Sequence, residues 1–174
     1  MHQRGSLRNE MLLNLLVIFS VVISTGAVYY DLKILENATQ ARCLDGTVSG
    51  YYFEKATQSS DNSKFVFYLQ GGGECDNEDA CKSQLETAHG SSTYFPKTSD
   101  SDYWYLGSGN CADNPEFCTW NHVNIPYCSQ DLYSGQRTEV SEETFGLYFS
   151  GHLILSSILD EFDELYNLKE ASEM

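Results

Sequence analysis

The fold of this chain is decided by one stretch, Lys64-Phe-Val-Phe-Tyr-Leu-Gln-Gly-Gly-Gly-Glu-Cys-Asp-Asn77. Its first half is a continuous apolar and aromatic run, whose length and β-branched content predict a buried strand. The run then stops on three consecutive glycines, Gly71, Gly72 and Gly73. Glycine frees the backbone conformation and leaves N–H groups accessible, so we expect this turn to offer its N–H groups to a negative charge.

Other segments alternate between strand and helix patterns. Strands are predicted over residues 51–55 and 123–127, and a short helix over residues 80–88. A longer helix is predicted from near Gly151 to near Asn167, because apolar residues recur at helical spacing and acidic residues form a solvated opposite face. Residues 89–118, rich in Ser, Gly, Asp and Asn, are typical of a long loop region. The alternation of strands and helices predicts an α/β architecture.

Length and charge limit the partners that the chain can have. Its 174 residues suit one modest domain, and an apolar content of 41% is enough for a core. Acidic residues number 25 against 10 basic ones, which gives a net charge of −15. Such an acidic surface repels phosphate backbones, so a nucleic-acid partner is not expected.

The first residues of the chain form a separate unit. Arg4 and Arg8 precede the apolar run from Met11 to Ile23, and small residues follow at positions 24–26. This layout is typical of a secretory signal peptide, here residues 1–26. The alternative is an uncleaved signal anchor, which polar residues within the run disfavour. We expect a secreted protein with no membrane span after cleavage and with residues 27–42 as an N-terminal lead-in.

Six cysteines follow the leader, and an even count behind an export signal indicates disulfides. The short spacings suggest two local bridges, Cys75–Cys81 and Cys111–Cys118, which leaves Cys43 with Cys128. Zinc is the competing interpretation. It is disfavoured because no Cys-x-x-Cys is present and the histidines stand singly, so neither a metal nor a cofactor is expected. The sequon Asn37-Ala-Thr39 predicts an N-glycan on Asn37.

Three uses of the glycine turn compete with a purely structural turn. A P-loop requires Lys-Ser/Thr after its glycines, which is absent, and Glu74 and Asp76 would repel phosphate. A dinucleotide fingerprint requires a further glycine that is also absent. An oxyanion hole requires only backbone N–H groups directed at one point on a turn after a strand. The sequence is therefore compatible with an oxyanion hole at this turn.

Several segments of the chain carry recognisable motifs. They are Cys43-Leu-Asp-Gly-Thr47, Leu69-Gln-Gly-Gly-Gly-Glu-Cys75, His89-Gly-Ser-Ser92, Trp120-Asn121 and Ile125-Pro-Tyr-Cys-Ser-Gln-Asp-Leu-Tyr-Ser-Gly135. Together they resemble the pectin acetylesterase/Notum family of secreted carboxylesterases. The second resembles the family segment Leu-Glu-Gly-Gly-Gly-Trp-Cys, and the third is similar to its Leu-Gly-Ser-Ser. The resemblance runs from about Cys43 to Leu165, with its motifs in family order.

The resemblance implies an α/β-hydrolase-like fold and a Ser-His-Asp mechanism. It assigns the backbone N–H groups of Gly72 and Gly73 to the oxyanion, and it agrees with the Cys43–Cys128 and Cys75–Cys81 bridges. The implied substrates are acylated glycans, such as acetylated pectin, or acylated proteins. This chain departs from the family pattern at Gln70, where the family has Glu, and at Glu74, where it has a bulky aromatic residue.

The nucleophile signature Gly-x-Ser-x-Gly is missing from the chain. Gly90-Ser91-Ser92 has the right offset, but Tyr94 occupies the position of the second glycine. We therefore expect no catalytic triad residue in this chain, which looks like the N-terminal part of an esterase domain over residues 43–174, with an incomplete fold. Two function classes stay open: a secreted ester hydrolase of which this is a part, and a non-catalytic secreted binding protein.

Overall fold

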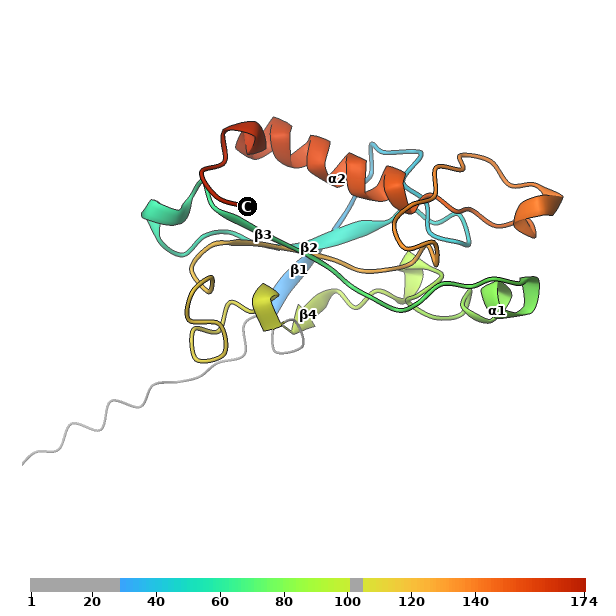
Figure 1. Ribbon diagram of the computed structural model, residues 1–174, viewed down its shortest axis with the longest axis horizontal. Coiled ribbons are helices and arrows are strands. Elements are labelled where there is room, and N and C mark those ends of the chain that lie inside the picture. Colours follow the sequence, from blue (N-terminus) through green and yellow to red (C-terminus); the bar gives the residue numbers. More distant parts are fainter. Residues whose placement is uncertain (1–28, 101–104) are drawn as a thin grey trace, which may run out of the picture.

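A parallel pair of strands, β3 (Phe65–Leu69) and β5 (Asn121–Ile125), forms the part of the fold that carries the glycine turn. The structure is a computed structural model, and it describes residues 29–100 and 105–174 (Figure 1). Parallel strands require a long crossover connection. In this chain the crossover runs from the glycine turn through a short helix to β5. Its last part is a long loop region, called the cystine-tied loop because it contains the Cys111–Cys118 disulfide.

The two parallel strands belong to a mixed sheet with the order β3-β5-β2-β1-β4. β2 (Gly50–Glu54) lies antiparallel to β5 on one side and to β1 (Tyr29–Ile34) on the other. β4 (Thr98–Asp100) is antiparallel to β1 and ends the sheet. The predicted α/β class and the strands predicted over 51–55, 64–69 and 123–127 are confirmed to within two residues.

One face of the sheet is covered by α2 (Gly151–Tyr166), which lies along it in Figure 1. The ring of Phe162 on α2 packs edge-on against rings from β2 and β3 at centroid distances of 5.0–6.2 Å: Tyr51, Phe53, Phe65 and Phe67. α2 ends at Asn167, whose left-handed conformation (φ 54°) is a common helix stop. The predicted C-terminal helix is thus confirmed, and it contributes Ile154, Ile158 and Phe162 to the main core.

β1 is a strand that the sequence analysis did not predict, because it treated residues 27–42 as a lead-in. β1 instead pairs with two neighbours, and its Tyr30 is fully buried. The hydroxyl of Tyr30 donates to the carbonyl of Gly107 and accepts the N–H of Gly109, which holds the cystine-tied loop against this face. The strand has only six residues and comes soon after the apolar leader, so the alternation of apolar and polar residues typical of a strand is hard to recognise in the sequence.

The short helix begins and ends earlier than expected. The predicted range 80–88 is wrong, since α1 spans Glu78–Ser83 and is capped by Asn77, whose side chain accepts the N–H of Ala80 at 2.9 Å. Asn77 is a preferred N-cap residue, which explains the earlier start. After α1 the backbone turns repeatedly up to Gly90, because Thr87 accepts backbone N–H groups there.

The structure contains three disulfides, Cys43–Cys128, Cys75–Cys81 and Cys111–Cys118, and these are the pairs suggested by the spacing. The predicted signal peptide, residues 1–26, lies outside the described residues. Across residues 29–100 and 105–174, every helix is too short or too polar to cross a bilayer.

Candidate functional site: the glycine turn after β3

The glycine turn lies at the carboxyl end of β3, beside the carboxyl end of the parallel strand β5. Ligands of α/β proteins bind at this edge of the sheet. Gly71, Gly72 and Gly73 are all exposed, and Gly73 has a φ of +80°, which glycine adopts without strain. A Cβ atom at Gly71 or Gly73 would meet nothing within 4 Å. The turn is therefore open on the side where a substrate would approach.

The base of the turn is fixed to β5 by hydrogen bonds through Gln70. Its backbone N–H donates to the carbonyl of Ile125 at 3.0 Å, and its side-chain oxygen accepts the N–H of Tyr127 at 3.1 Å. The hydroxyl of Tyr133 donates to the carbonyls of both Gln70 and Ile125, at 3.1 and 3.0 Å. Gln70 stands where the family pattern has Glu. It holds the turn in place through hydrogen bonds between uncharged groups.

The loop that follows β5 contacts the residues directly after the glycines and carries unusual backbone conformations. Gln130, Leu132 and Tyr133 all have φ between 52° and 57°. Such values cost free energy in non-glycine residues and persist only where the surroundings enforce them. The N–H of Leu132 donates to the hydroxyl of Tyr127 at 2.6 Å. Because the Tyr127 ring lies against Gly72, this bond connects the strained loop to the glycine turn.

Asp131 is the hub of this loop. Its carboxylate accepts the Ser129 hydroxyl at 2.6 Å and three backbone N–H groups, those of Tyr133, Gly135 and Gly151, at 3.1, 3.2 and 2.8 Å. Gly151 is the first residue of α2, where a carboxylate is favoured by the helix dipole. Asp131 lies in the matching segment Ile125–Gly135, but no local pattern in the sequence indicates its role, because its partners include the start of a helix twenty residues later.

Two aromatic rings lie against Gly72. A Cβ atom on Gly72 would be 2.9 Å from Cδ1 of Tyr127 and 3.4 Å from both Cδ2 and Nε2 of His89. The second glycine is therefore required for close packing, whereas Gly73 is required for its conformation. His89 was expected to be an isolated histidine, and only the tertiary structure places it beside the turn.

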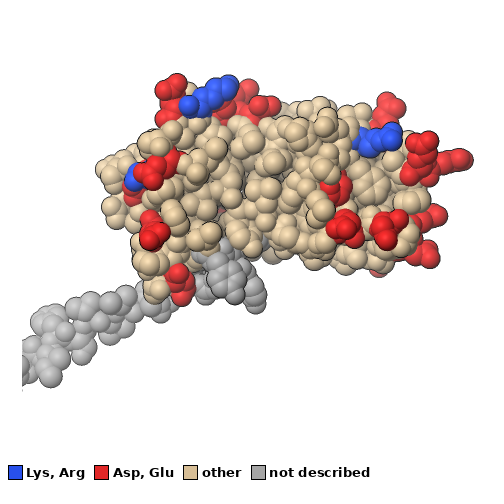
Figure 2. All heavy atoms as spheres, in the orientation of Figure 1, with Lys and Arg blue, Asp and Glu red and all other residues tan. Residues whose placement is uncertain are grey.

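Negative charge surrounds the site. Glu74 is exposed directly after the glycines and forms an isolated β-bridge with Asp131. Burial raises the pKa of Tyr127, and the charges of Asp131 and Glu74 raise it further, against the lowering effect of the hydrogen bond from Leu132. Acidic side chains also gather at the end of the molecule that carries α1, on the right in Figure 2.

No nucleophile–base pair is assembled within residues 29–100 and 105–174. The His122 ring is engaged with backbone, since its Nε2 atom lies 2.9 Å from the carbonyl oxygen of Phe117. His122 is buried, and this burial lowers its pKa. The hydroxyls of Ser91 and Thr93 share a hydrogen bond at 2.7 Å, and the N–H of Ser92 donates to the hydroxyl of Thr47 at 3.0 Å. The described residues thus present an open glycine turn at the carboxyl end of β3.

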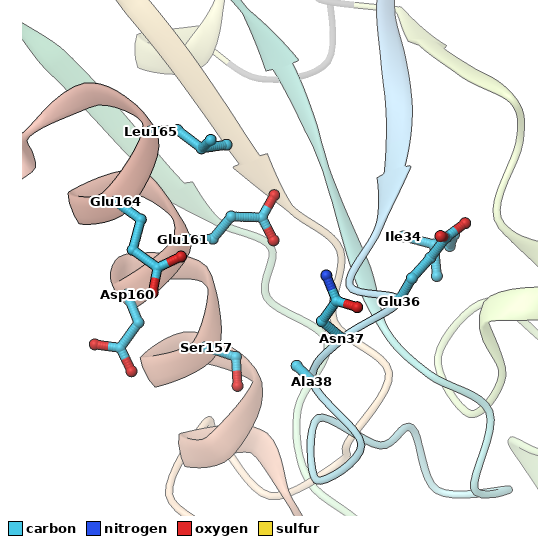
Figure 3. A pocket seen from close by; sticks show the side chains of 9 residues that line it. All are labelled: Ile34, Glu36, Asn37, Ala38, Ser157, Asp160, Glu161, Glu164 and Leu165. Carbon is cyan, nitrogen blue, oxygen red and sulfur yellow. The ribbon is translucent and has the colours of Figure 1, made fainter.

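A separate groove of about 470 Å³ lies between α2 and the turn after β1 (Figure 3). Its lining carries the carboxylates of Glu36, Asp160, Glu161 and Glu164. Asn37, the predicted glycan acceptor, is exposed at its rim. Glu161 is bound to the Tyr51 hydroxyl at 2.6 Å, so the groove presents structural and solvated carboxylates and is distinct from the glycine turn.

Comparison with known proteins defines the class. The model of the pectinacetylesterase family matches residues 24–174. A palmitoleoyl-protein carboxylesterase NOTUM from Schmidtea mediterranea is 36% identical over 148 residues, which cover 84% of this chain and 27% of that protein. Pectin acetylesterase 4 from Arabidopsis thaliana is 38% identical over 133 residues, covering 75% of this chain and 32% of that protein. The chain thus spans about a third or less of the length of these relatives.

Comparison with a solved structure also relates this chain to Notum. The Wnt deacylase Notum from Drosophila superposes with a TM-score of 0.72 and 30% sequence identity, covering 84% of this chain and 41% of that one. The fold is therefore α/β-hydrolase-like, and the similar proteins are named as a palmitoleoyl-protein carboxylesterase, a pectin acetylesterase and a Wnt deacylase. The chain belongs to the pectinacetylesterase family, as its sequence motifs indicate.

Proposed function

We propose that this chain supplies the oxyanion-binding part of a secreted carboxylic ester hydrolase. In this proposal, residues 1–26 are a signal peptide and residues 43–174 are part of the hydrolase domain, to whose sheet the preceding segment adds the strand β1. The backbone N–H groups of Gly72 and Gly73 donate to the acyl oxygen as negative charge develops on it. Such preorganised donors lower the barrier because they need no reorganisation during the reaction.

The observation that carries the proposal is the geometry of the glycine turn and of the hydrogen bonds that hold it. Gly73 adopts φ +80° directly after a strand, on a turn whose base is fixed by Gln70, Tyr127 and Tyr133 and whose outer side is open. A turn without chemistry would not need this rigidity together with exposed N–H groups. The relatives named above act on a palmitoleoyl-protein or on pectin, so an acylated protein or an acylated glycan is the proposed substrate.

A second candidate is a non-catalytic secreted binding protein. It is favoured by one observation, that neither a serine–histidine hydrogen bond nor a Gly-x-Ser-x-Gly turn occurs among the described residues. Such a protein would hold an acyl ester at the glycine turn without cleaving it. The two candidates share the turn and differ in whether an attacking group reaches it.

The test transfers the turn into an active relative. Gln70–Glu74 replaces the five matching residues of the Drosophila Notum enzyme, and hydrolysis of p-nitrophenyl acetate is measured. Because loss of one oxyanion donor costs about 10²–10³ in turnover, a competent turn keeps activity within about tenfold. Gly73→Pro in the graft removes one donor and should cost about 10²–10³. A graft that is secreted normally but is inactive would contradict the proposal.

A further inference from the structure

The sequon residue Asn37 is held in a fixed position beside the groove between α2 and the turn after β1. The turn is tied to the sheet, because the N–H of Leu35 donates to the carbonyl of Ser49 at 3.0 Å and the N–H of Ala38 donates to the carbonyl of Leu35 at 2.9 Å. Leu35 is buried in the main core, and Ala38 packs against that core. Asn37 is exposed, and its amide nitrogen points to the side of the groove on which the Glu161 carboxylate lies (Figure 3). An N-glycan is attached through this nitrogen, so its first sugar begins at the groove.

The charges of the groove limit the chemistry of an occupant. Three carboxylates of α2 line one wall, and ionised carboxylates accept hydrogen bonds but donate none: Asp160, Glu161 and Glu164. An occupant must therefore supply donors, and an anion would be repelled. In the part of the chain that the structure describes, no three His, Cys, Asp or Glu side chains are placed to hold a metal ion, so the geometry does not favour a bound cation. A neutral polyol such as a sugar meets both conditions.

The groove also has apolar walls that suit a sugar ring. Ile34 at the end of β1 is 39% exposed and Leu165 on α2 is 62% exposed, and both line the groove, from opposite sides (Figure 3). A sugar ring combines apolar C–H faces with hydroxyl donors around its edge, so it can contact apolar side chains and carboxylates together. The volume of about 470 Å³ lies in the range of small-molecule sites, roughly 300–1,000 Å³. Glu161 is a fixed acceptor in this lining, because its Oε1 atom accepts the Tyr51 hydroxyl at 2.6 Å.

A sugar attached to Asn37 needs little intrinsic affinity to occupy the groove. Attachment through a short link gives an effective concentration in about the millimolar range, so weak contacts are enough. A group that binds the folded state and not the unfolded chain stabilises the folded state. Because the groove lies between the turn after β1 and α2, a sugar bound there joins the first strand to the helix that covers the sheet.

We propose that this groove binds the first N-acetylglucosamine of a glycan on Asn37. The hydroxyl and amide groups of the sugar donate to the carboxylates of α2, and its ring packs between Ile34 and Leu165. The sequon predicts only that a glycan is attached, whereas its binding in the groove makes it a structural link between the turn and α2. Because the groove contains no residue of the glycine turn, the proposal goes beyond the proposed function and shares with it only the secretory route.

The experiment compares two forms of the full chain, made in a eukaryotic secretory host with high-mannose glycans and purified from the medium or the cell extract. Endoglycosidase H trims the first form to a single N-acetylglucosamine on Asn37, and Asn37→Gln prevents attachment in the second. Both forms are also made with Glu164→Ala, which removes a carboxylate from the groove wall. Glu86→Ala is the matched control, since it removes the same charge at an exposed position outside the groove. Thermal unfolding and amide hydrogen exchange are measured for each.

We expect the single-sugar form to melt about 2–4 °C above the Asn37→Gln form, and the amides of residues 157–165 to exchange more slowly in it. Glu164→Ala should reduce this gain by about half, because one charged acceptor is lost, and Glu86→Ala should leave it unchanged. Melting temperatures that agree within about 1 °C would overturn the inference. A gain that Glu164→Ala leaves intact, or a chain without a glycan on Asn37, would overturn it as well. Each of these outcomes leaves the proposed function standing, because the graft of residues 70–74 tests the glycine turn separately.

Discussion

The carboxylate of Asp131 accepts the backbone N–H of Gly151 at 2.8 Å and thereby joins the loop after β5 to the start of α2. The same carboxylate accepts the N–H groups of Tyr133 and Gly135. This residue links the main core helix to the loop that supports the glycine turn, so the integrity of the site depends on it.

Replacing Asp131 by Ala should therefore destabilise the whole chain. Three backbone N–H groups and the Ser129 hydroxyl lose their acceptor, and the strained conformations of Leu132 and Tyr133 lose their support. We expect a loss of about 2–4 kcal/mol in the free energy of unfolding, measured by urea denaturation. Asp45→Ala is the control, since Asp45 is exposed and serves only Thr47. Equal losses in the two variants would show that Asp131 is not the hub.

Replacing Gly72 by Ala should disturb the turn, whereas Gly71→Ala should not. The added Cβ atom at Gly72 meets the ring of Tyr127 at 2.9 Å, while at Gly71 it meets nothing within 4 Å. We expect Gly72→Ala to cost about 1–3 kcal/mol, as overpacking does, and to shift the NMR signals of Tyr127 and His89. Identical spectra and stabilities for the two variants would contradict the packing described here.

Glu54 should make stability depend on pH. Its Oε2 atom is buried without a hydrogen-bond partner, and burial is the largest cause that raises the pKa of Glu54 above its ordinary value of 4.5. A raised pKa in the folded state means that stability falls as pH rises from 4.5 through the folded-state value.

Replacing Glu54 by Gln removes this ionisation. We therefore expect Glu54→Gln to gain in melting temperature, relative to the unmodified protein, between pH 4 and pH 7. Thermal unfolding followed by circular dichroism at both pH values measures the difference. Glu36→Gln, at an exposed position, controls for net charge. A constant difference between Glu54→Gln and the unmodified protein at both pH values would show that the carboxyl is not perturbed.

Residues 1–174 expressed alone should not react with a fluorophosphonate serine probe. Such probes require an activated serine, and the Gly-x-Ser-x-Gly nucleophile signature does not occur in these 174 residues. Hydrolysis of p-nitrophenyl acetate by this chain should stay at the background of an inert protein. Stoichiometric labelling that is lost when one serine is replaced by Ala would show that the chain carries its own nucleophile.

Expression in a eukaryotic secretory host should yield a chain cleaved close to Gly26 and glycosylated at Asn37. Asn37 lies exposed in a turn after β1, where a transferase can reach it. Edman sequencing of the secreted protein, together with a mobility shift after glycosidase treatment that Asn37→Gln abolishes, tests both points. A membrane-bound product that begins with Met1 would favour the uncleaved anchor.

The sequence by itself determined those features that depend on local pattern. The apolar run of β3 predicted the strand that carries the glycine turn, and the helical spacing from Leu155 to Tyr166 predicted α2. Both signals are local, because burial of one face imposes a period on consecutive residues. The family motifs, which also lie in consecutive residues, predicted the α/β-hydrolase-like fold.

The tertiary structure alone decided which distant residues meet at the turn. β1 became an internal strand only through its pairing with β2 and β4, since its own sequence is too short to show a period. His89 and Tyr127 are separated from Gly72 by many residues, yet both rings pack against it. Asp131 joins a loop to a helix that begins twenty residues later. Such contacts arise from packing between elements, and no spacing rule within one segment encodes them.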